Sequence, residues 1–149
     1  MIAMQFWIFT AEEIAFVWKL LASLSAGIII GMERELRGKP AGISTHSLVI
    51  GGSMIFTALS IHMDPNSPAR IAAQVVSGIG FLGAGMILKG KSEKIKNLTT
   101  AASIWFAASI GMAIGFGWYL IAVVATLYSV LVPLIPRFKS RDLYPHNKD

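Results

Sequence analysis

The sequence predicts an all-α, polytopic membrane protein with about five transmembrane helices. Of its 149 residues, 54% are hydrophobic and only 14% are charged, and the mean hydropathy is +0.63. Soluble domains carry about 25% charged residues, and a globule of this size exposes too much surface to hide so many apolar side chains. The apolar residues also gather in segments close to the length of a bilayer crossing. The chain has no cysteine, which excludes a disulfide framework and a thiolate metal site.

Five segments approach the roughly 20 apolar residues that a membrane-spanning helix needs. The expected spans cover residues 14–32, 45–63, 71–88, 98–114 and 118–135. The second and fourth carry several Ser, Thr and Gly residues, so a four-span alternative would lose one of them. Turn chemistry separates the segments. Ser67 is placed to cap the third helix and Asn97 the fourth, and residues 115–117 are expected to form a short hairpin.

Basic residues lie almost entirely on one side of the predicted membrane. Because they favour the cytoplasmic side, we expect the N-terminus outside and the C-terminus inside, which requires an odd number of spans. This placement also argues against nucleic-acid binding. We divide the chain into a transmembrane domain, residues 1–136, and a short basic cytoplasmic tail, residues 137–149. Eleven of the 13 basic residues follow the first, third or fifth span: Arg34, Arg37, Lys39, Lys89, Lys91, Lys94, Lys96, Arg137, Lys139, Arg141 and Lys148.

The first apolar segment is expected to remain in the protein as a span. The N-terminus lacks the basic region of a signal peptide, and Glu12 and Glu13 precede the apolar run. Lys19 lies about 9 Å into this segment, taking 1.5 Å per residue. We expect its long side chain to snorkel to the outer surface.

Residues 77–85, SGIGFLGAG, match the G-x-G-x-x-G string of dinucleotide-binding sites. That function requires a preceding strand, a helix opening at the glycines and an acidic residue about 20 positions later. Here the string lies inside one apolar span and no carboxylate follows at that distance, so we interpret the match as accidental.

Glycines are instead interpreted as helix-packing residues, since small residues let helices approach closely in lipid. We expect the glycine-rich third span to be the central helix. Two G-x-x-x-G pairs, in the first and fourth spans, serve either packing within the chain or a homodimer seam. The predicted packing residues are Gly27, Gly31, Gly78, Gly80, Gly83, Gly85, Gly111 and Gly115.

The most distinctive polar stretch is GMERELRGKPAGISTH, residues 31–46. Glu33 and Arg37 are four residues apart and should pair on one helix face, and Glu35 and Lys39 repeat the spacing. Two interpretations stay open. The charges form either a salt-bridged helix end at the cytoplasmic interface or a carboxylate at the inner mouth of a cavity, with Thr45 or His46 nearby.

Gln74 places an amide inside the third span. It either forms a hydrogen bond between helices or joins a polar path with Ser77, Thr99 and Thr100. No Asp or Glu falls in the middle of a span, which counts against simple carboxylate-based ion transport. The sequence shows no nucleophile–base arrangement and no metal-ligand spacing. We therefore expect no enzymatic activity and no resident cofactor, while binding of Mg²⁺ stays open.

Two blocks of the chain resemble the MgtC/SapB family of bacterial inner-membrane proteins. The first, GMERELRGKPAGISTHSLV (residues 31–49), is close to the family's G-x-E-R-E-x-R-x-K-x-A-G-hydrophobic-x-T-H pattern. The second, RIAAQVVSGIGFLGAGMILK (residues 70–89), is followed by LTTAASIWFAASIGMAIGFG (residues 98–117). The resemblance covers nearly the whole chain from the first span to the fifth.

This resemblance implies a multi-pass protein of the bacterial cytoplasmic membrane, associated with adaptation to low magnesium. It implies a regulator of other membrane proteins rather than a magnesium transporter. Many members continue into a soluble C-terminal domain, and we expect this chain to be a short member without it. Where the family often has glycine before L-T-T-A, this sequence has Asn97. The positions that match the family's functional residues, as candidates for binding an ion or a partner, are Glu33, Arg34, Arg37, Thr45, His46 and Gln74.

These observations together lead us to expect a homodimeric membrane protein linked to magnesium or general ion homeostasis, which packs against another membrane protein. Two alternatives stay open. One is a small channel or transporter for Mg²⁺ or another ion, with a path from Glu33 to Gln74. The other is a lipid-binding or purely structural membrane module.

Overall fold

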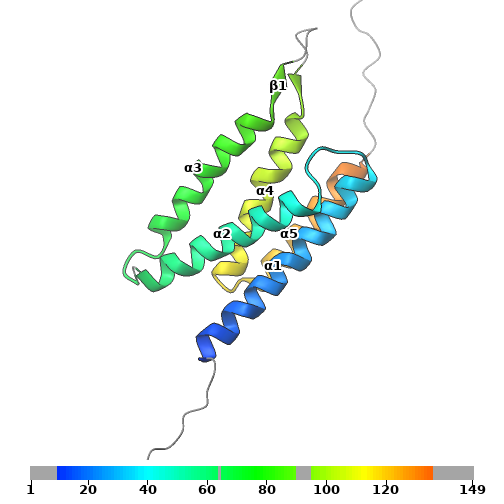
Figure 1. The fold of residues 1–149 in the computed structure, drawn as a ribbon. Coiled ribbons are helices and arrows are strands. Elements are labelled where there is room, and N and C mark those ends of the chain that lie inside the picture. Colours follow the sequence, from blue (N-terminus) through cyan, green and yellow to red (C-terminus); the bar gives the residue numbers. More distant parts are fainter. Residues whose placement is uncertain (1–9, 64, 90–94, 136–149) are drawn as a thin grey trace, which may run out of the picture.

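A computed structural model describes residues 10–63, 65–89 and 95–135, and Figure 1 shows how their helices are arranged. A two-residue antiparallel ladder joins β1 (Leu88–Lys89) to β2 (Ile95–Lys96) between the third and fourth helices. The five helices confirm the predicted all-α class. The predicted tail, residues 137–149, and Lys91 and Lys94 lie outside the described residues. The helices are α1 (Ala11–Leu36), α2 (Ile43–Met63), α3 (Ala69–Met86), α4 (Leu98–Gly115) and α5 (Tyr119–Leu131), which the 3-10 turn η1 (Val132–Leu134) extends.

Four of the helices, α1 to α4, are long and apolar enough to cross a bilayer. The fifth predicted span is a helix, but a shorter one. Helix α5 and η1 together reach about 25 Å, taking 1.5 Å per α-helical and 2.0 Å per 3-10 residue, against a hydrocarbon core of about 30 Å. Pro133 lies within η1, and a proline cannot continue an α-helix because it lacks the backbone N–H.

Two helices end in the same glycine-dependent turn. After α1, Gly38 has a φ of +63°, and the N–H of Lys39 donates to the Arg34 carbonyl at 3.0 Å. After α4, Gly117 has a φ of +81°, and the N–H of Trp118 donates to the Ala113 carbonyl at 2.8 Å. This is the Schellman arrangement, in which a left-handed residue satisfies the last helical carbonyls. The predicted hairpin at residues 115–117 is therefore confirmed.

The two predicted N-terminal caps are wrong in detail. At the start of α3, Pro68 is the capping residue without a side-chain bond, and the hydroxyl oxygen of Ser60, from the end of α2, accepts the N–H of Ile71 at 3.3 Å. At the start of α4, Asn97 holds the capping position, but its side chain makes no capping hydrogen bond. Its φ is +63°, whereas a capping side chain normally needs extended backbone.

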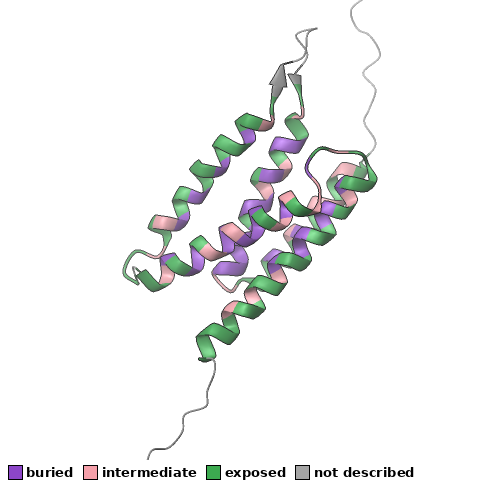
Figure 2. Ribbon diagram, viewed as in Figure 1, coloured by how far each residue is buried: buried purple, intermediate pink, exposed green. Residues whose placement is uncertain are grey.

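Helix α4, not α3, is the central helix of the bundle. It packs against α1, α2, α3 and α5, and Figure 1 shows α3 at the edge of the molecule beside α4. In Figure 2 the buried residues follow α4 and α2, while α3 is mostly exposed. The expectation for the third span was wrong because three of its four glycines, Gly78, Gly80 and Gly85, face outward. Helix α4 is instead lined by small residues on several sides, such as Thr100, Ala107 and Gly111.

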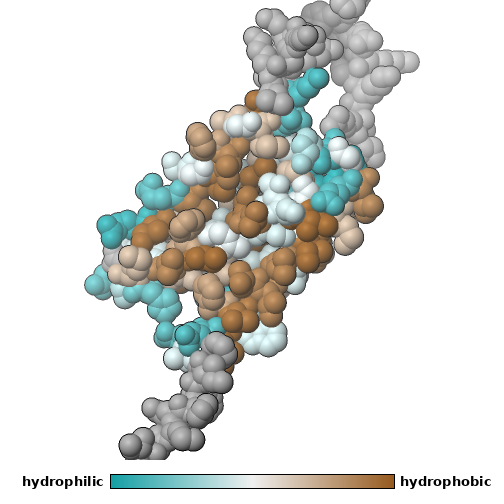
Figure 3. Space-filling view, in the orientation of Figure 1, coloured by the Kyte–Doolittle hydropathy of each residue, from teal (hydrophilic) through white to brown (hydrophobic). Residues whose placement is uncertain are grey.

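Many large apolar side chains lie on the outside of the molecule. Trp18, Phe81 and Leu120 are 65%, 83% and 77% exposed, and hydrophobic side chains cover much of the middle of the face in Figure 3. Several polar residues, including Ser23 and Thr57, are fully buried. Soluble monomers rarely expose so large an apolar surface. Such a surface is expected where lipid is the solvent. The helices are thus arranged for a bilayer.

Candidate functional site

Three of the predicted site residues meet where α1 ends. Arg34 is 4% exposed, and its guanidinium donates to the hydroxyl of Thr100, on α4, at 2.8 Å. Arg37 forms the predicted ion pair with Glu33 at 2.9 Å, and it also donates to the carbonyl of Pro133 at 2.6 Å. This end of the bundle therefore ties α1 to α4 and to the turn that follows α5. We define the inner polar cluster as Glu33, Arg34, Arg37, His46 and Thr100.

The geometry of the cluster depends on how the chain passes from α1 to α2. A Cβ at Gly31 would collide with the backbone of Ile43, so glycine lets α2 begin directly against α1. The carboxylate of Glu35 accepts the N–H of Ile43 at 2.9 Å, and the predicted pairing of Glu35 with Lys39 is wrong. The first N–H groups of a helix lack partners and carry partial positive charge, which explains why this carboxylate turns toward α2.

His46 is completely buried in the first turns of α2. Its Nδ1 lies 3.0 Å from the carbonyl of Gly42. Because a carbonyl only accepts, Nδ1 carries the proton. Its Nε2 has no partner among the described residues. Thr45, beside it, is half-buried.

Four buried polar atoms near this end have no hydrogen-bond partner in the described part of the chain. They are Glu33 Oε2, Arg34 Nε, His46 Nε2 and Ser47 Oγ. Buried polar groups in folded proteins nearly always have partners. The cluster therefore retains hydrogen-bonding capacity that the described residues do not use.

Gln74 lies apart from the inner polar cluster. It is exposed on α3 and lines a groove of about 470 Å³ between α2 and α3, together with Phe56, Gly78 and Leu82. We call this the α2–α3 groove. Phe56 follows His46 by ten residues, which is about 15 Å along α2. Among the described residues no hydrogen bond joins Gln74 to Thr100, whose hydroxyl accepts from Arg34.

The predicted packing glycines divide into two groups. In the first, a Cβ would collide with a neighbouring helix: Gly27 with Ser47, Gly31 with Ile43, Gly111 with Ile50 and Gly115 with Thr57. These G-x-x-x-G pairs thus pack α1 and α4 against α2. The second group lies on α3. A Cβ at Gly83 would only touch Ala101, at 3.9 Å. A Cβ at Gly78, Gly80 or Gly85 would meet no atom within 4 Å.

Lys19 has a more specific contact than the predicted snorkelling. Its Nζ donates to the carbonyl of Gly115 at 2.7 Å. Gly115 is the last residue of α4, where the helix carries partial negative charge. The ammonium group of Lys19 therefore binds the C-terminal end of α4, and this hydrogen bond links the first half of α1 to α4.

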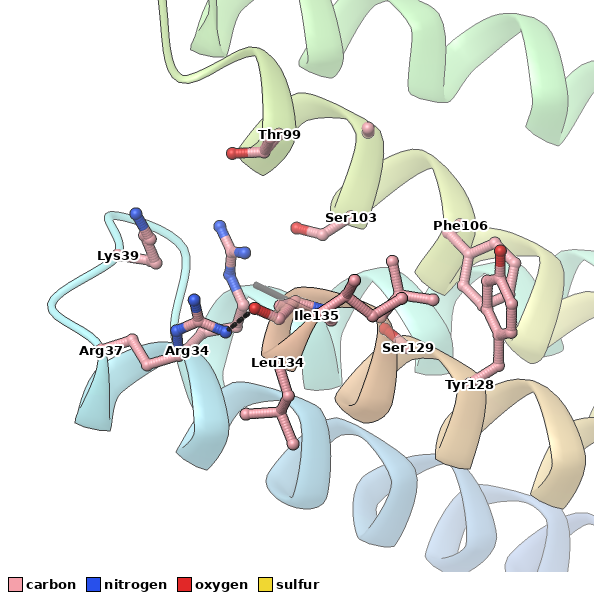
Figure 4. Close-up of a pocket in the computed structure, with 13 residues that line it drawn as sticks. Arg34, Arg37, Lys39, Thr99, Ser103, Phe106, Tyr128, Ser129, Leu134 and Ile135 are labelled. Carbon is pink, nitrogen blue, oxygen red and sulfur yellow. Dashed lines mark hydrogen bonds between the residues drawn. The ribbon is translucent and has the colours of Figure 1, made fainter. Parts of the chain in front are cut away.

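A second hollow opens beside the inner polar cluster, between α1, α4 and the end of α5. We call it the cationic pocket; its volume is about 680 Å³. Arg34, Arg37 and Lys39 lie at one end, and Figure 4 shows them with Ser103 and Tyr128 farther along the wall. Sequence reasoning missed Ser103, Ser129 and Tyr128. The predicted topology could have indicated them. It places the end of the first span, the start of the fourth and the end of the fifth on the same side of the membrane, so residues near these ends are expected to lie close together.

The described residues bring together no group of three or more His, Cys, Asp or Glu side chains that could hold a metal ion. The model of the MgtC family matches residues 20–140. The chain belongs to the MgtC family. Members of this family are bacterial inner-membrane proteins, and the helices described above agree with that environment.

Relatives in several bacteria share the MgtC-type sequence. The protein MgtC of Salmonella typhimurium LT2 is 41% identical over 122 residues, which are 82% of this chain and 52% of that protein. A protein of Escherichia coli K12 named "Putative magnesium transporter YhiD" is 45% identical over 132 residues, 83% of this chain and 60% of that one. An uncharacterized protein of Haemophilus influenzae Rd is 40% identical over 148 residues, 90% and 62%. The chain thus spans less than two thirds of these relatives. No solved structure matches it significantly.

Proposed function

We propose that this protein is a magnesium-linked, non-enzymatic regulator of the inner membrane that binds a helix of another membrane protein in its α2–α3 groove. The observation that carries the proposal is the amide of Gln74. It is exposed in a groove lined by apolar residues, about 7 Å inside the start of α3. Among the described residues it has no hydrogen-bond partner. An amide facing hydrocarbon is costly, and hydrogen bonds of this kind hold helices together in membranes.

The groove also suits a helix by its shape. Gly78 lines it and leaves the α3 backbone open to close approach, since a Cβ there would meet nothing within 4 Å. Small residues that permit such approach are typical of helix interfaces in lipid. The link to magnesium comes from the name of the Escherichia coli relative and from the resemblance to a family associated with low magnesium.

A photo-crosslinking side chain tests the groove. Placed at Phe56, which is 55% exposed in the groove, it should give an adduct whose mass differs from that of two copies of this chain. The matched position is Trp105, 51% exposed on α4 and outside the groove, which should give none. The adduct should disappear with Gln74→Leu, and this variant should also fail to restore growth of a deletion strain on limiting magnesium. An adduct at the mass of a dimer would replace the partner by a second copy, and equal adducts at both positions would refute the groove.

Ion transport is the second candidate, and the unpartnered buried atoms of the inner polar cluster favour it. Glu33 Oε2, His46 Nε2 and Ser47 Oγ could accept hydrogen bonds from waters around an ion. Proteoliposomes loaded with a magnesium-sensitive dye separate the two candidates. Magnesium entry that Glu33→Gln abolishes and Trp105→Leu leaves unchanged would favour transport. The regulator proposal expects no entry above that of empty vesicles.

A further inference from the structure

We propose that the cationic pocket binds the phosphate group of an anionic lipid, with the lipid's acyl chain lying along the apolar wall between α4 and α5. The proposal is independent of the α2–α3 groove. It rests on the charge that the pocket concentrates, on the burial of Arg34 and on the mixed character of the pocket walls.

The charge at the end of the pocket is unbalanced. Arg34, Arg37 and Lys39 all line it. Within the described residues the ion pair of Arg37 with Glu33 is the one close pairing available to them, and Glu35 is engaged by the N–H of Ile43. Among the described residues, Arg34 and Lys39 therefore form no ion pair with a carboxylate within 4 Å.

Arg34 makes this imbalance costly. The residue is 4% exposed, and of its donors one meets the Thr100 hydroxyl while Nε has no partner in the described part of the chain. Burial of a guanidinium is unfavourable when a donor is left unpartnered and no carboxylate of the described residues lies within ion-pair distance. Figure 4 shows its guanidinium extending toward α4 at the mouth of the pocket, on the side of Thr99. A phosphate is the anion whose oxygens match the donor fork of arginine.

The remaining walls identify the anion as part of an amphiphile. Away from the cations the pocket is lined by Phe106, Tyr128, Val132 and Leu134. The hydroxyls of Ser103 and Ser129 also line it, and such hydroxyls can donate hydrogen bonds to the ester oxygens of a lipid. A soluble phosphate ion would use the cationic end and leave the apolar wall unfilled. A lipid would occupy both the cationic end and the apolar wall. Basic pockets between transmembrane helices are known to bind anionic lipid head groups in this way.

Native mass spectrometry of the full chain in detergent tests the site. Phosphatidylglycerol and phosphatidylcholine with the same acyl chains are titrated separately. We expect tight binding of phosphatidylglycerol, a loss of roughly 5-fold for Lys39→Gln and roughly 30-fold for Arg37→Gln combined with Lys39→Gln, from the contribution of each basic residue near an anionic surface. The matched control is Lys96→Gln, an exposed lysine outside the pocket, which should retain binding.

A pocket-filling variant separates a built site from general surface charge. Ala102 lines the pocket and is exposed, so Ala102→Phe should reduce binding of phosphatidylglycerol without changing any charge. Inorganic phosphate should fail to displace the lipid at millimolar concentration. Complete displacement would assign the site to a soluble anion and overturn the lipid. Equal binding of the two lipids, or equal losses in Lys39→Gln and Lys96→Gln, would overturn the pocket itself.

Discussion

Asn97 shows how one residue can set the start of a helix by its backbone alone. It is the one non-glycine residue with a positive φ in the described part of the chain, and it stands where the β hairpin passes into α4. The left-handed region costs most residues about 1–2 kcal/mol, and glycine and asparagine enter it most readily. Glycine, which the family resemblance implies at this position, would meet the same requirement as the asparagine of this chain.

Asn97→Gly is therefore expected to leave stability nearly unchanged, whereas Asn97→Ala should lower the free energy of unfolding by about 1 kcal/mol. Thermal unfolding in detergent, followed by the fluorescence of the four tryptophans, measures both. An alanine variant as stable as the glycine variant would show that the backbone relaxes out of the left-handed region.

At the same scale, the sequence predicted contacts only where spacing along one helix decides them. The pairing of Glu33 with Arg37 followed from their separation by four residues and is present. Contacts between different helices could not be predicted from the sequence. Arg34 with Thr100 and Arg37 with Pro133 join residues 66 and 96 positions apart, and no local pattern encodes which helix end faces another.

The helices show why a glycine pattern alone does not identify a packed face. The string in α3 and the pairs in α1 and α4 look alike in sequence, yet the described structure gives close neighbours to the pairs and an open surface to most of the string. Helix α4 is central because it is buried on several sides by small residues. Its position was not predictable from its apolar length, which equals that of α3 at 18 residues.

Alanine at two glycines separates these situations. Gly111→Ala should destabilise the protein by about 1–3 kcal/mol, because its Cβ would press on the carbonyl of Ile50. Gly80→Ala should be neutral or stabilising by up to about 1 kcal/mol, since alanine is the better helix former and nothing lies near it. Unfolding midpoints in the same detergent give the comparison. Similar losses in both variants would mean that α3 is covered as closely as α4.

For the molecule as a whole, the number of helices and their membrane character could be predicted from composition and segment length, because both follow from the thickness and polarity of the bilayer. The arrangement could not, since packing in lipid depends on shape rather than on hydrophobicity. Orientation stays a prediction from the distribution of basic residues.

The orientation can be measured directly because the chain contains no cysteine. Asn66→Cys, in the turn between α2 and α3, should react with a membrane-impermeant maleimide added outside the inner membrane. Lys96→Cys, exposed just before α4, should react only after the membrane is opened. The reverse pattern would place the basic loops outside and contradict the predicted topology.

The short last helix has a consequence for the surrounding lipid. Helix α5 and η1 reach about 25 Å where the hydrocarbon is about 30 Å thick, so we expect the bilayer to thin by a few ångströms along this flank. Such hydrophobic mismatch costs fractions of a kcal/mol per ångström. The protein should accordingly unfold at a higher temperature in vesicles of short-chain lipids than in vesicles of long-chain lipids, and in a mixed membrane it should gather where the leaflets are thinnest.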